Sequence, residues 1–309
     1  MKLLFAGTPD AAVPSLEALI ASSHEIVGVI TQPPAPAGRG RQLMPSAIHQ
    51  VANAHSLDVY TFTDINTVDS REALSALDFD AVAVVAYGQL LKPETLELAP
   101  LGWINLHFSL LPAWRGAAPV QRAIMAGDDV TGATTFLLNA GMDTGAILGQ
   151  MPVEIGSDET AGDLLQRLSL EGAGLLVATF DAIESGVASP REQSTDGVSM
   201  APKITVAEVN LKWHHPALGI SRWVRGATPE PGAWTTFGDQ RIGIAPVELV
   251  LDVTDLAPGQ LRVSKSDVLV GTGSHALRLG QVKPAGKGWM AAADWARGIR
   301  DSELRFEYV

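Results

Sequence analysis

"AVAVVAYGQLLKPETLELAPLGWINLHFSLLP" occupies residues 81–112 and decides the fold of the N-terminal two-thirds of the chain. Its first seven residues, Ala81–Tyr87, are apolar without alternation, as in a central parallel strand that is covered on both faces. A short helix is expected over Pro93–Leu98, and a second strand over Trp103–Ser109. This strand–helix–strand order is typical of an α/β sheet.

The same alternation continues on both sides of this segment. Further strands are predicted at Lys2–Gly7, Glu25–Thr31, Val59–Phe62, Thr131–Asn139 and Ile147–Ile155, and further helices at Ala11–Ser22, Ser46–Ala54, Val68–Leu77 and Thr160–Ser185. The stretch Gln32–Ser46 is too rich in proline and glycine for regular structure. The pattern predicts a doubly wound, Rossmann-like α/β domain, which binds ligands at the carboxyl ends of its strands.

The pattern changes after about Thr205. A helix is predicted over His215–Ala227, then short β-like runs broken by glycine and proline, then a late helix in "MAAADWARG" (Met290–Gly298). Such spacing indicates a small barrel or sandwich. We therefore expect two domains, residues 1–205 and residues 206–309.

Composition narrows the class of protein. The 309 residues are 46% hydrophobic and 18% charged, which is typical of an ordered globular protein. The absence of cysteine excludes disulfides, thiol nucleophiles and cysteine metal sites. The opening "MKLLFAGTPD" turns polar too early for a signal peptide, and the aliphatic runs are too short to span a bilayer. We expect a cytoplasmic protein.

The net charge of −12 is unevenly distributed. Residues 1–206 hold 10 Lys and Arg against 23 Asp and Glu, whereas residues 207–309 hold 12 against 11. An acidic total argues against binding of nucleic acid through net charge alone. The nearly neutral C-terminal part can still carry a basic face, and otherwise the acidic surface keeps the protein soluble.

Polar side chains alternate at the end of the second quoted strand. In a strand, Asn105, His107 and Ser109 share one face, while Leu106 and Phe108 point to the other. Burying an amide, an imidazole and a hydroxyl is costly unless they are hydrogen-bonded or open onto a ligand. Alone, each is best explained as a polar strand end; together, they indicate a site that stabilises an oxyanion and moves a proton.

Two loops carry further candidates. Asp143 lies in "GMDTG", between two glycines, where aspartate is common in turns. If this loop instead returns to the strand that carries His107, the Asp143 carboxylate favours the charged form of the imidazole. Arg39 and Arg41 lie in the Pro/Gly-rich stretch, which is either a surface connection or a lid whose arginines bind phosphate or the end of a nucleic acid.

Several common motifs are missing. "FAGTPD" does not continue as G-x-G-x-x-G, and the chain has no G-x-x-x-x-G-K-[ST] loop. His214 and His215 are adjacent and lack the i, i+4 spacing of helical zinc sites. Ser109 is not in a G-x-S-x-G elbow, so a serine hydrolase has little support.

These residues together resemble the folate-dependent formyltransferases. "NLHFSLLP" is similar to the Asn-x-His-x-Ser-Leu-Leu-Pro signature of that family, and "GMDTG" to its aspartate loop. "FAGTPD", "TQPPAPAGRGRQLMPS", "VVAYGQLL", "LPAWRGAAPVQRAI", "APKI" and "GAWTTF" are similar, in the same order, to segments of the members that formylate the methionine of initiator methionyl-tRNA. The resemblance covers nearly the whole chain.

The resemblance implies a role for each matched residue. Asn105 and His107 would hold the formyl oxygen of 10-formyltetrahydrofolate, the co-substrate, and Asp143 would orient His107 and help to move the proton of the attacking amine. The segment Ser109, Leu110, Leu111 and Pro112 would contact the folate carrier. Arg39 and Arg41 would bind the tRNA acceptor end, and an OB-like C-terminal barrel would hold the tRNA from the other side. No metal is implied, and a monomer is expected.

Two departures and several alternatives remain. Phe108 stands where the family often has glycine, although strand alternation turns it away from the polar face, and the net charge is unusually acidic for an enzyme that binds tRNA.

Relatives with the same Asn, His and Asp include glycinamide ribonucleotide formyltransferase, which is usually a single domain. Formyltetrahydrofolate hydrolases and sugar-nucleotide formyltransferases also share these residues, and their second domain can be similar. A non-catalytic module with a decayed site is a further alternative, which the intact Asn105, His107 and Asp143 argue against.

Overall fold

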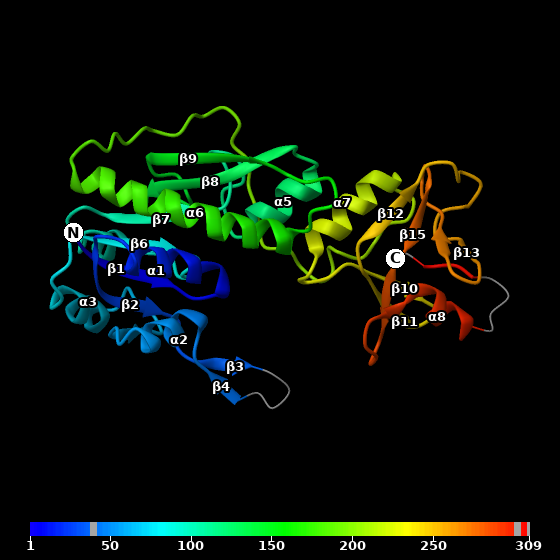
Figure 1. The fold of residues 1–309 in the computed structure, drawn as a ribbon, viewed down its shortest axis with the longest axis horizontal. Coiled ribbons are helices and arrows are strands. Elements are labelled where there is room, and N and C mark those ends of the chain that lie inside the picture. Colours follow the sequence, from blue (N-terminus) through cyan, green and yellow to red (C-terminus); the bar gives the residue numbers. More distant parts are fainter. Residues whose placement is uncertain (38–41, 300–303, 308–309) are drawn as a thin grey trace. The chain divides into compact units, whose positions relative to one another are not determined.

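The computed structural model describes residues 1–37, 42–299 and 304–307 and divides the chain into two compact units (Figure 1). The N-terminal unit comprises Met1–Pro119, Val130–Glu154 and Leu165–Ala201. The C-terminal unit comprises Val120–Asp129, Ile155–Leu164 and Pro202–Val309. None of the helices in the described part of the chain is both long and apolar enough to cross a membrane.

A seven-stranded sheet forms the centre of the N-terminal unit, in the order β5-β2-β1-β6-β7-β8-β9. The strands are β1 (Lys2–Gly7), β2 (Glu25–Thr31), β5 (Val59–Thr61), β6 (Ala81–Val85), β7 (Trp103–His107), β8 (Val130–Leu137) and β9 (Ile147–Glu154). The first five are parallel, which confirms the predicted α/β alternation, whereas β8 and β9 are antiparallel to their neighbours. The sheet is therefore mixed: β8 runs opposite to both β7 and β9, and the short connection 138–146 joins β8 to β9 without a crossover.

Helices separate these strands along the chain. They are η1 (Asp10–Ala12), α1 (Val13–Ile20), α2 (Ala47–Ala54), α3 (Val68–Ser75), α4 (Pro93–Leu96), α5 (Pro119–Ala126) and α6 (Ala161–Glu184). The hydroxyls of Ser46 and Thr67 cap α2 and α3 by accepting a backbone N–H three residues later. A side chain at Gly172 of α6 would lie 3.2 Å from Leu106 of β7, so glycine allows a close approach to the sheet.

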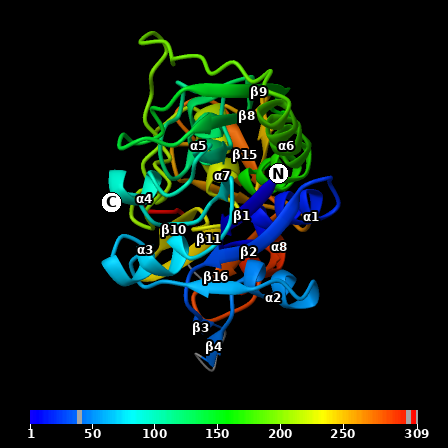
Figure 2. The ribbon, with the colours of Figure 1, turned by 90° about the vertical axis from the view of Figure 1, so that its left-hand side faces the viewer.

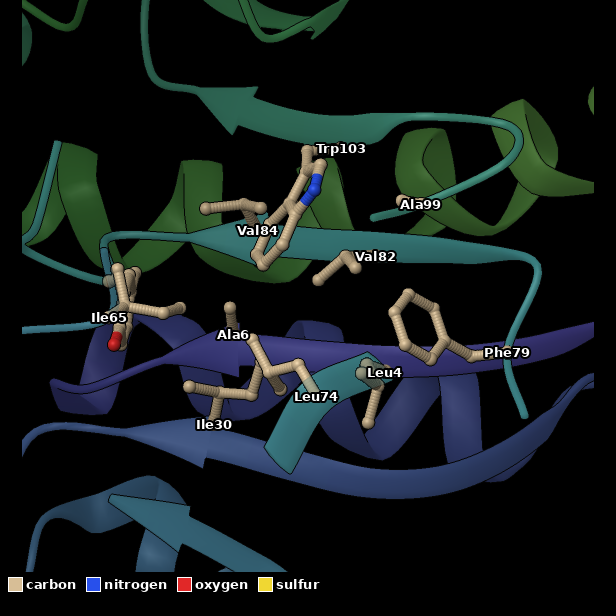
Figure 3. Close-up of a cluster of buried hydrophobic side chains, with 11 residues drawn as sticks. Leu4, Ala6, Ile30, Ile65, Leu74, Phe79, Val82, Val84, Ala99 and Trp103 are labelled. Carbon is tan, nitrogen blue, oxygen red and sulfur yellow. The ribbon is translucent and has the colours of Figure 1, made fainter. Parts of the chain in front are cut away.

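One face of this sheet is covered by apolar side chains (Figure 3). Leu4, Val82 and Trp103 extend from three adjacent strands, and Leu74 of α3 packs against them. All four are at most 1% exposed. Such burial on both sides of a strand is the reason that β6 reads as an unbroken apolar run.

The structure of the Pro/Gly-rich stretch Gln32–Ser46 differs from the prediction that it lacks regular structure. Its two flanks form a small antiparallel hairpin, β3 (Ala35–Ala37) and β4 (Gln42–Met44), which projects beyond α2 (Figures 1 and 2). The expectation of no regular structure was wrong because a two-stranded ribbon tolerates proline where no further strand pairs. Arg39 and Arg41 lie outside the described residues.

The C-terminal unit holds two four-stranded antiparallel sheets, in the orders β10-β11-β16-β17 and β12-β15-β14-β13. The strands are β10 (Trp234–Phe237), β11 (Gln240–Ile244), β12 (Val247–Val250), β13 (Leu261–Val263), β14 (Val268–Val270), β15 (Ala276–Leu279), β16 (Gln281–Pro284) and β17 (Met290–Ala291). The predicted helices are confirmed as α7 (Ala217–Ala227) and α8 (Ala292–Arg297). Trp213 and Trp295 stack on Phe306 at ring distances of 5.4 and 5.6 Å, an aromatic cluster that joins segments far apart in sequence.

Leu4→Ala tests the packing of the sheet. Leu4 is fully buried, so we expect the substitution to lower the free energy of unfolding by about 2–5 kcal/mol. Urea denaturation followed by circular dichroism measures the change. Val68→Ala, at an exposed position of α3, is the matched control and should change stability by no more than about 0.5 kcal/mol. Equal effects of the two substitutions would contradict this account of the core.

Candidate active site

The polar end of β7 opens into a cavity of about 500 Å³. Its walls come from the carboxyl ends of β6 and β7, from residues 86–91 and 116–119, and from the connection between β8 and β9. Asn105, His107 and Asp143 all line this cavity. A cavity at the carboxyl ends of parallel strands is where such sheets place their ligands, so the sequence predicted this location from the strand order.

His107 is held by a main-chain carbonyl. Its ring is 7% exposed, and Nε2 lies 2.8 Å from the carbonyl oxygen of Trp114. Because a carbonyl can only accept, Nε2 carries a hydrogen, and Nδ1 is the nitrogen left for proton transfer. The edge of the Phe136 ring faces the imidazole at a centroid distance of 6.4 Å.

Asp143 faces the other nitrogen. Its Oδ2 lies 3.8 Å from Nδ1 of His107 and accepts a hydrogen bond of 2.7 Å from the Gly116 N–H. At 3.8 Å the carboxylate acts on the imidazole as a charge, without a hydrogen bond. Burial lowers the pKa of His107 below its usual 6.5, while the Asp143 charge and the Trp114 carbonyl raise it. Because burial is the largest of these effects, the imidazole is mainly neutral at pH 7.

Asn105 supplies an amide to the same cavity. The residue is half-buried, two positions before His107 on the same strand, and its side chain makes no hydrogen bond to any residue that the structure describes. A half-buried amide in a cavity is a donor that a ligand oxygen can satisfy. Amide, imidazole and carboxylate together can bind a carbonyl oxygen and transfer a proton.

Ser109 departs from the expected alternation. β7 ends at His107, and the fully buried Ser109 hydroxyl donates to the Ala113 carbonyl at 2.6 Å. Leu111 is also bonded within the unit, its N–H to the Thr134 hydroxyl at 3.1 Å. Among the described residues that line the cavity, none comes from Ser109–Pro112. The shared face therefore holds Asn105 and His107, and Ser109 stabilises the turn that follows.

Phe108 also differs from expectation. It lines the cavity together with Asn105 and His107, whereas strand alternation predicted that it faces away. β7 ends at His107, two residues before the predicted end at Ser109, so the period of two no longer fixes the direction of the Phe108 side chain. Phe108 adds an aromatic residue to the lining of the cavity.

Three residues around the site have unusual backbone angles. Ala86, Trp114 and Asp143 have φ of +48°, +61° and +51°, although none is glycine. Ala86 and Asp143 line the cavity, and Trp114 supplies the carbonyl that holds His107. Left-handed backbone costs on the order of 1–3 kcal/mol per residue and is found where surrounding contacts impose it, often at functional sites.

The loop after β6 is fixed by side chains from other segments. The Tyr87 carbonyl accepts from the Thr8 hydroxyl at 2.9 Å and from Gln32 Nε2 at 3.1 Å. Gln89 bridges the Phe62 carbonyl and the Ile65 N–H. These bonds make the wall formed by residues 86–91 a preformed surface.

Sequence reasoning missed Trp114 and Gly116. Both act through main-chain groups, so their side-chain types carry no signal of the role. The positive φ of Gly116, +124°, is the one property that sequence could have indicated. Among the described residues, the group able to offer three metal ligands is His24, Asp181 and Glu184, and none of them lines this cavity.

Comparison with known proteins gives two family matches. Residues 1–180 match a model described as formyl transferase, and residues 203–300 match the formyl transferase C-terminal domain. A methionyl-tRNA formyltransferase of Pseudarthrobacter chlorophenolicus is 54% identical over 303 residues, 98% of each chain. That of Salinispora arenicola is 50% identical over 300 residues, 97% of each chain.

A solved structure gives the same fold. The N-formyltransferase from Helicobacter canadensis, in complex with folinic acid and dTDP-3-aminofucose, matches with a TM-score of 0.68 over 90% of this chain and 98% of that chain. Its sequence identity is 18%, so the likeness concerns the fold alone.

Asp143→Asn tests the electrostatic coupling in the site. The substitution removes the charge that favours the imidazolium, so we expect the pKa of His107 to fall further below 6.5. NMR titration of the imidazole resonances measures this pKa. Asp196→Asn, at an exposed position of the same unit, is the control and should leave it unchanged. A rise in the pKa of His107 upon Asp143→Asn would contradict the assignment.

Proposed function

Because this chain belongs to the formyl transferase family, we propose that it transfers the formyl group of 10-formyltetrahydrofolate to the amino group of methionine on initiator methionyl-tRNA. The observation that carries the proposal is the meeting of Asn105, His107 and Asp143 in one cavity. Relatives that share half or more of the sequence over the whole chain bear the name of this activity. The chain is thus a one-carbon transferase.

The cavity suits a folate. Its volume of about 500 Å³ lies in the range of small-ligand sites, and Leu91, Phe108 and Leu138 give it apolar walls beside the Asn105 amide. Apolar walls with a few polar groups fit a flat, substituted ring such as a pteridine. The proposed contact of Ser109, Leu110, Leu111 and Pro112 with the folate stays a prediction, because these residues do not line the cavity and the Ser109 hydroxyl and Leu111 N–H are already bonded.

Asn105 and His107 stabilise the negative charge that develops on the formyl oxygen. The Asn105 amide donates directly, and His107 donates once Nδ1 is protonated. The free imidazole is mainly neutral, but a developing oxyanion favours the charged form. Asp143 stabilises that imidazolium from 3.8 Å. Both donors therefore bind the transition state more strongly than the substrate.

Asp143 also takes part in the proton balance. As the amine nitrogen bonds to the formyl carbon, it becomes positively charged, and its proton passes by way of the Asp143 carboxylate to Nδ1 of His107, which thereby becomes the imidazolium that donates to the formyl oxygen. The same proton then goes to the folate nitrogen as its bond to the formyl carbon breaks. The attacking amine must be neutral, and a free α-amino group has a pKa of about 7.7–8.0, so a usable fraction is present near pH 7.

The hydrolase and sugar-nucleotide alternatives are not favoured. The relatives most similar over the full length are named for the tRNA reaction, whereas the sugar N-formyltransferase shares 18% identity. A direct assay separates them. Formyl transfer to initiator Met-tRNA is measured beside parallel reactions with glycinamide ribonucleotide and with water. Release of tetrahydrofolate without a formylated acceptor would support a hydrolase.

The tRNA would be bound through local basic groups. We assign Arg39 and Arg41, which lie between β3 and β4 in the sequence, to the acceptor end, and residues 206–309 to a tRNA-binding domain with an OB-like barrel. The catalytic domain would then comprise residues 1–205. This boundary lies close to residue 203, where the match to the C-terminal family model begins. We further propose that the enzyme is a monomer and acts in the cytoplasm.

Asn105→Ala and His107→Ala test the catalytic roles. One lost oxyanion donor costs about 2.7–4 kcal/mol in comparable sites, so we expect each variant to lose roughly 100-fold or more in turnover with the fold intact. Formylation rates under saturating substrates and circular dichroism measure the two properties. Asn53→Ala, at an exposed position of α2, is the control and should keep full activity. Near-normal turnover in either of the two site variants would overturn the role of the residue replaced.

Arg39→Ala and Arg41→Ala test the assignment of the hairpin. If each arginine contacts a phosphate, binding of tRNA weakens and the slope of log K against log salt concentration falls by about one for each residue lost. Binding titrations at several salt concentrations give the slope. Arg167→Ala on α6 is the control of equal charge change. An unchanged slope in both hairpin variants would remove the hairpin from the tRNA site.

A further inference from the structure

Gln193 joins Arg115, on the turn that holds the His107 ring, to the loop that carries Asp143. It lies on the segment after α6, which runs beside β9 and pairs with it through a bridge between Ile147 and Arg191 (Figure 1). Neither its position in the sequence nor a motif sets it apart. Its side chain is half-buried and bonded at both ends to the surroundings of the candidate active site.

The amide nitrogen of Gln193 fixes the aspartate loop. Nε2 donates to the carbonyl of Asp143 at 2.8 Å and to that of Gly145 at 2.8 Å. Asp143 has a φ of +51°, a conformation that needs outside support. Two bonds from one planar amide hold the carbonyls on either side of Thr144, which sets the direction of the Asp143 side chain.

The amide oxygen of Gln193 fixes the other loop. Oε1 accepts from Nε and Nη2 of Arg115, at 3.0 and 2.7 Å. The backbone of Arg115 bonds to Ser199 and Ala201, and the N–H of Trp114 donates to the Ser199 hydroxyl at 2.8 Å. The turn that supplies the Trp114 carbonyl is thus held by the same segment.

These contacts close a ring. His107 donates to the carbonyl of Trp114, and the next residue, Arg115, donates to Gln193. Gln193 in turn donates to the backbone carbonyl of Asp143, whose carboxylate faces His107. The 3.8 Å between carboxylate and imidazole therefore depends both on the Gly116 N–H, which bonds the carboxylate, and on the Gln193 side chain, which holds the backbone of Asp143. Glutamate lacks its two donors, and lysine or arginine lacks its acceptor.

We propose that Gln193 is a positioning residue for formyl transfer, which acts through Asp143 and requires its amide; this rests on the proposed function. It touches neither substrate in the proposed reaction. Its loss leaves the walls formed by β6, β7 and residues 86–91 in place but loosens the backbone that carries the Asp143 carboxylate, which then keeps only its bond from the Gly116 N–H. A displacement on the order of 1 Å in such a site can cost about 100-fold in rate.

Gln193→Glu and Gln193→Leu test the proposal in the full-length chain, with Glu192→Ala as an exposed neighbour control. We expect kcat for initiator Met-tRNA to fall about 10- to 100-fold in both Gln193 variants. The KM values of both substrates should change less than about threefold, because the walls formed by β6, β7 and residues 86–91 make no contact with Gln193. Glu192→Ala should match the wild type.

A double-mutant cycle separates positioning from general support. Since Gln193 acts through Asp143, Gln193→Leu combined with Asp143→Asn should lose less than about threefold beyond Asp143→Asn alone. Losses that multiply would overturn the proposal, as would kcat within about twofold of wild type in Gln193→Leu. A loss that disappears once rates are corrected for the folded fraction by circular dichroism would do the same. A wild type that formylates no tRNA would instead refute the proposed function, before any variant is compared.

Discussion

The hydrogen bond from the His107 ring to the Trp114 carbonyl is the constraint on which the site depends. It puts a hydrogen on Nε2 and leaves Nδ1 as the nitrogen that faces Asp143. A carbonyl, unlike a carboxylate, does not take up a proton in the pH range in which proteins are folded, so Nε2 keeps its hydrogen in both the neutral and the charged ring. In the proposed reaction this leaves the carboxylate to act as a charge and to move a proton.

That bond requires backbone conformations which the chain would not adopt by itself. Trp114 has a φ of +61°, which is rare for a bulky residue, and Asp143 has a φ of +51°. Each is held from outside, Trp114 through Ser199 and Asp143 through Gln193. At Gly145 a Cβ would lie 1.7 Å from a backbone oxygen, so the aspartate loop also needs a residue without a side chain there. The catalytic loops are strained, and the segment after α6 supplies the bonds that maintain the strain.

The sequence predicted much of this arrangement, for physical reasons that differ by element. The strands of the parallel sheet and helix α6 follow from apolar runs and periodicity, which local sequence encodes. The place of Asn105 and His107 follows from strand order. The end of β7 at His107 was not predictable, because it depends on the bonds that Ser109 makes across the turn. Gln193 was not predictable either, since its role arises from contacts with residues 50 and 78 positions earlier.

The pKa of His107 shows why the carboxylate and the carbonyl occur together. Burial lowers the pKa of His107 and so disfavours the charged ring, which is the form that donates from Nδ1. A carboxylate in direct contact would have the opposite effect, because it would hold the proton between the two groups and away from the substrate. At 3.8 Å, Asp143 lowers the cost of the imidazolium without taking its hydrogen. In the proposed reaction, the imidazole becomes charged only when it takes up the proton that the amine loses, so its hydrogen bond to the formyl oxygen forms in the transition state and not in the ground state.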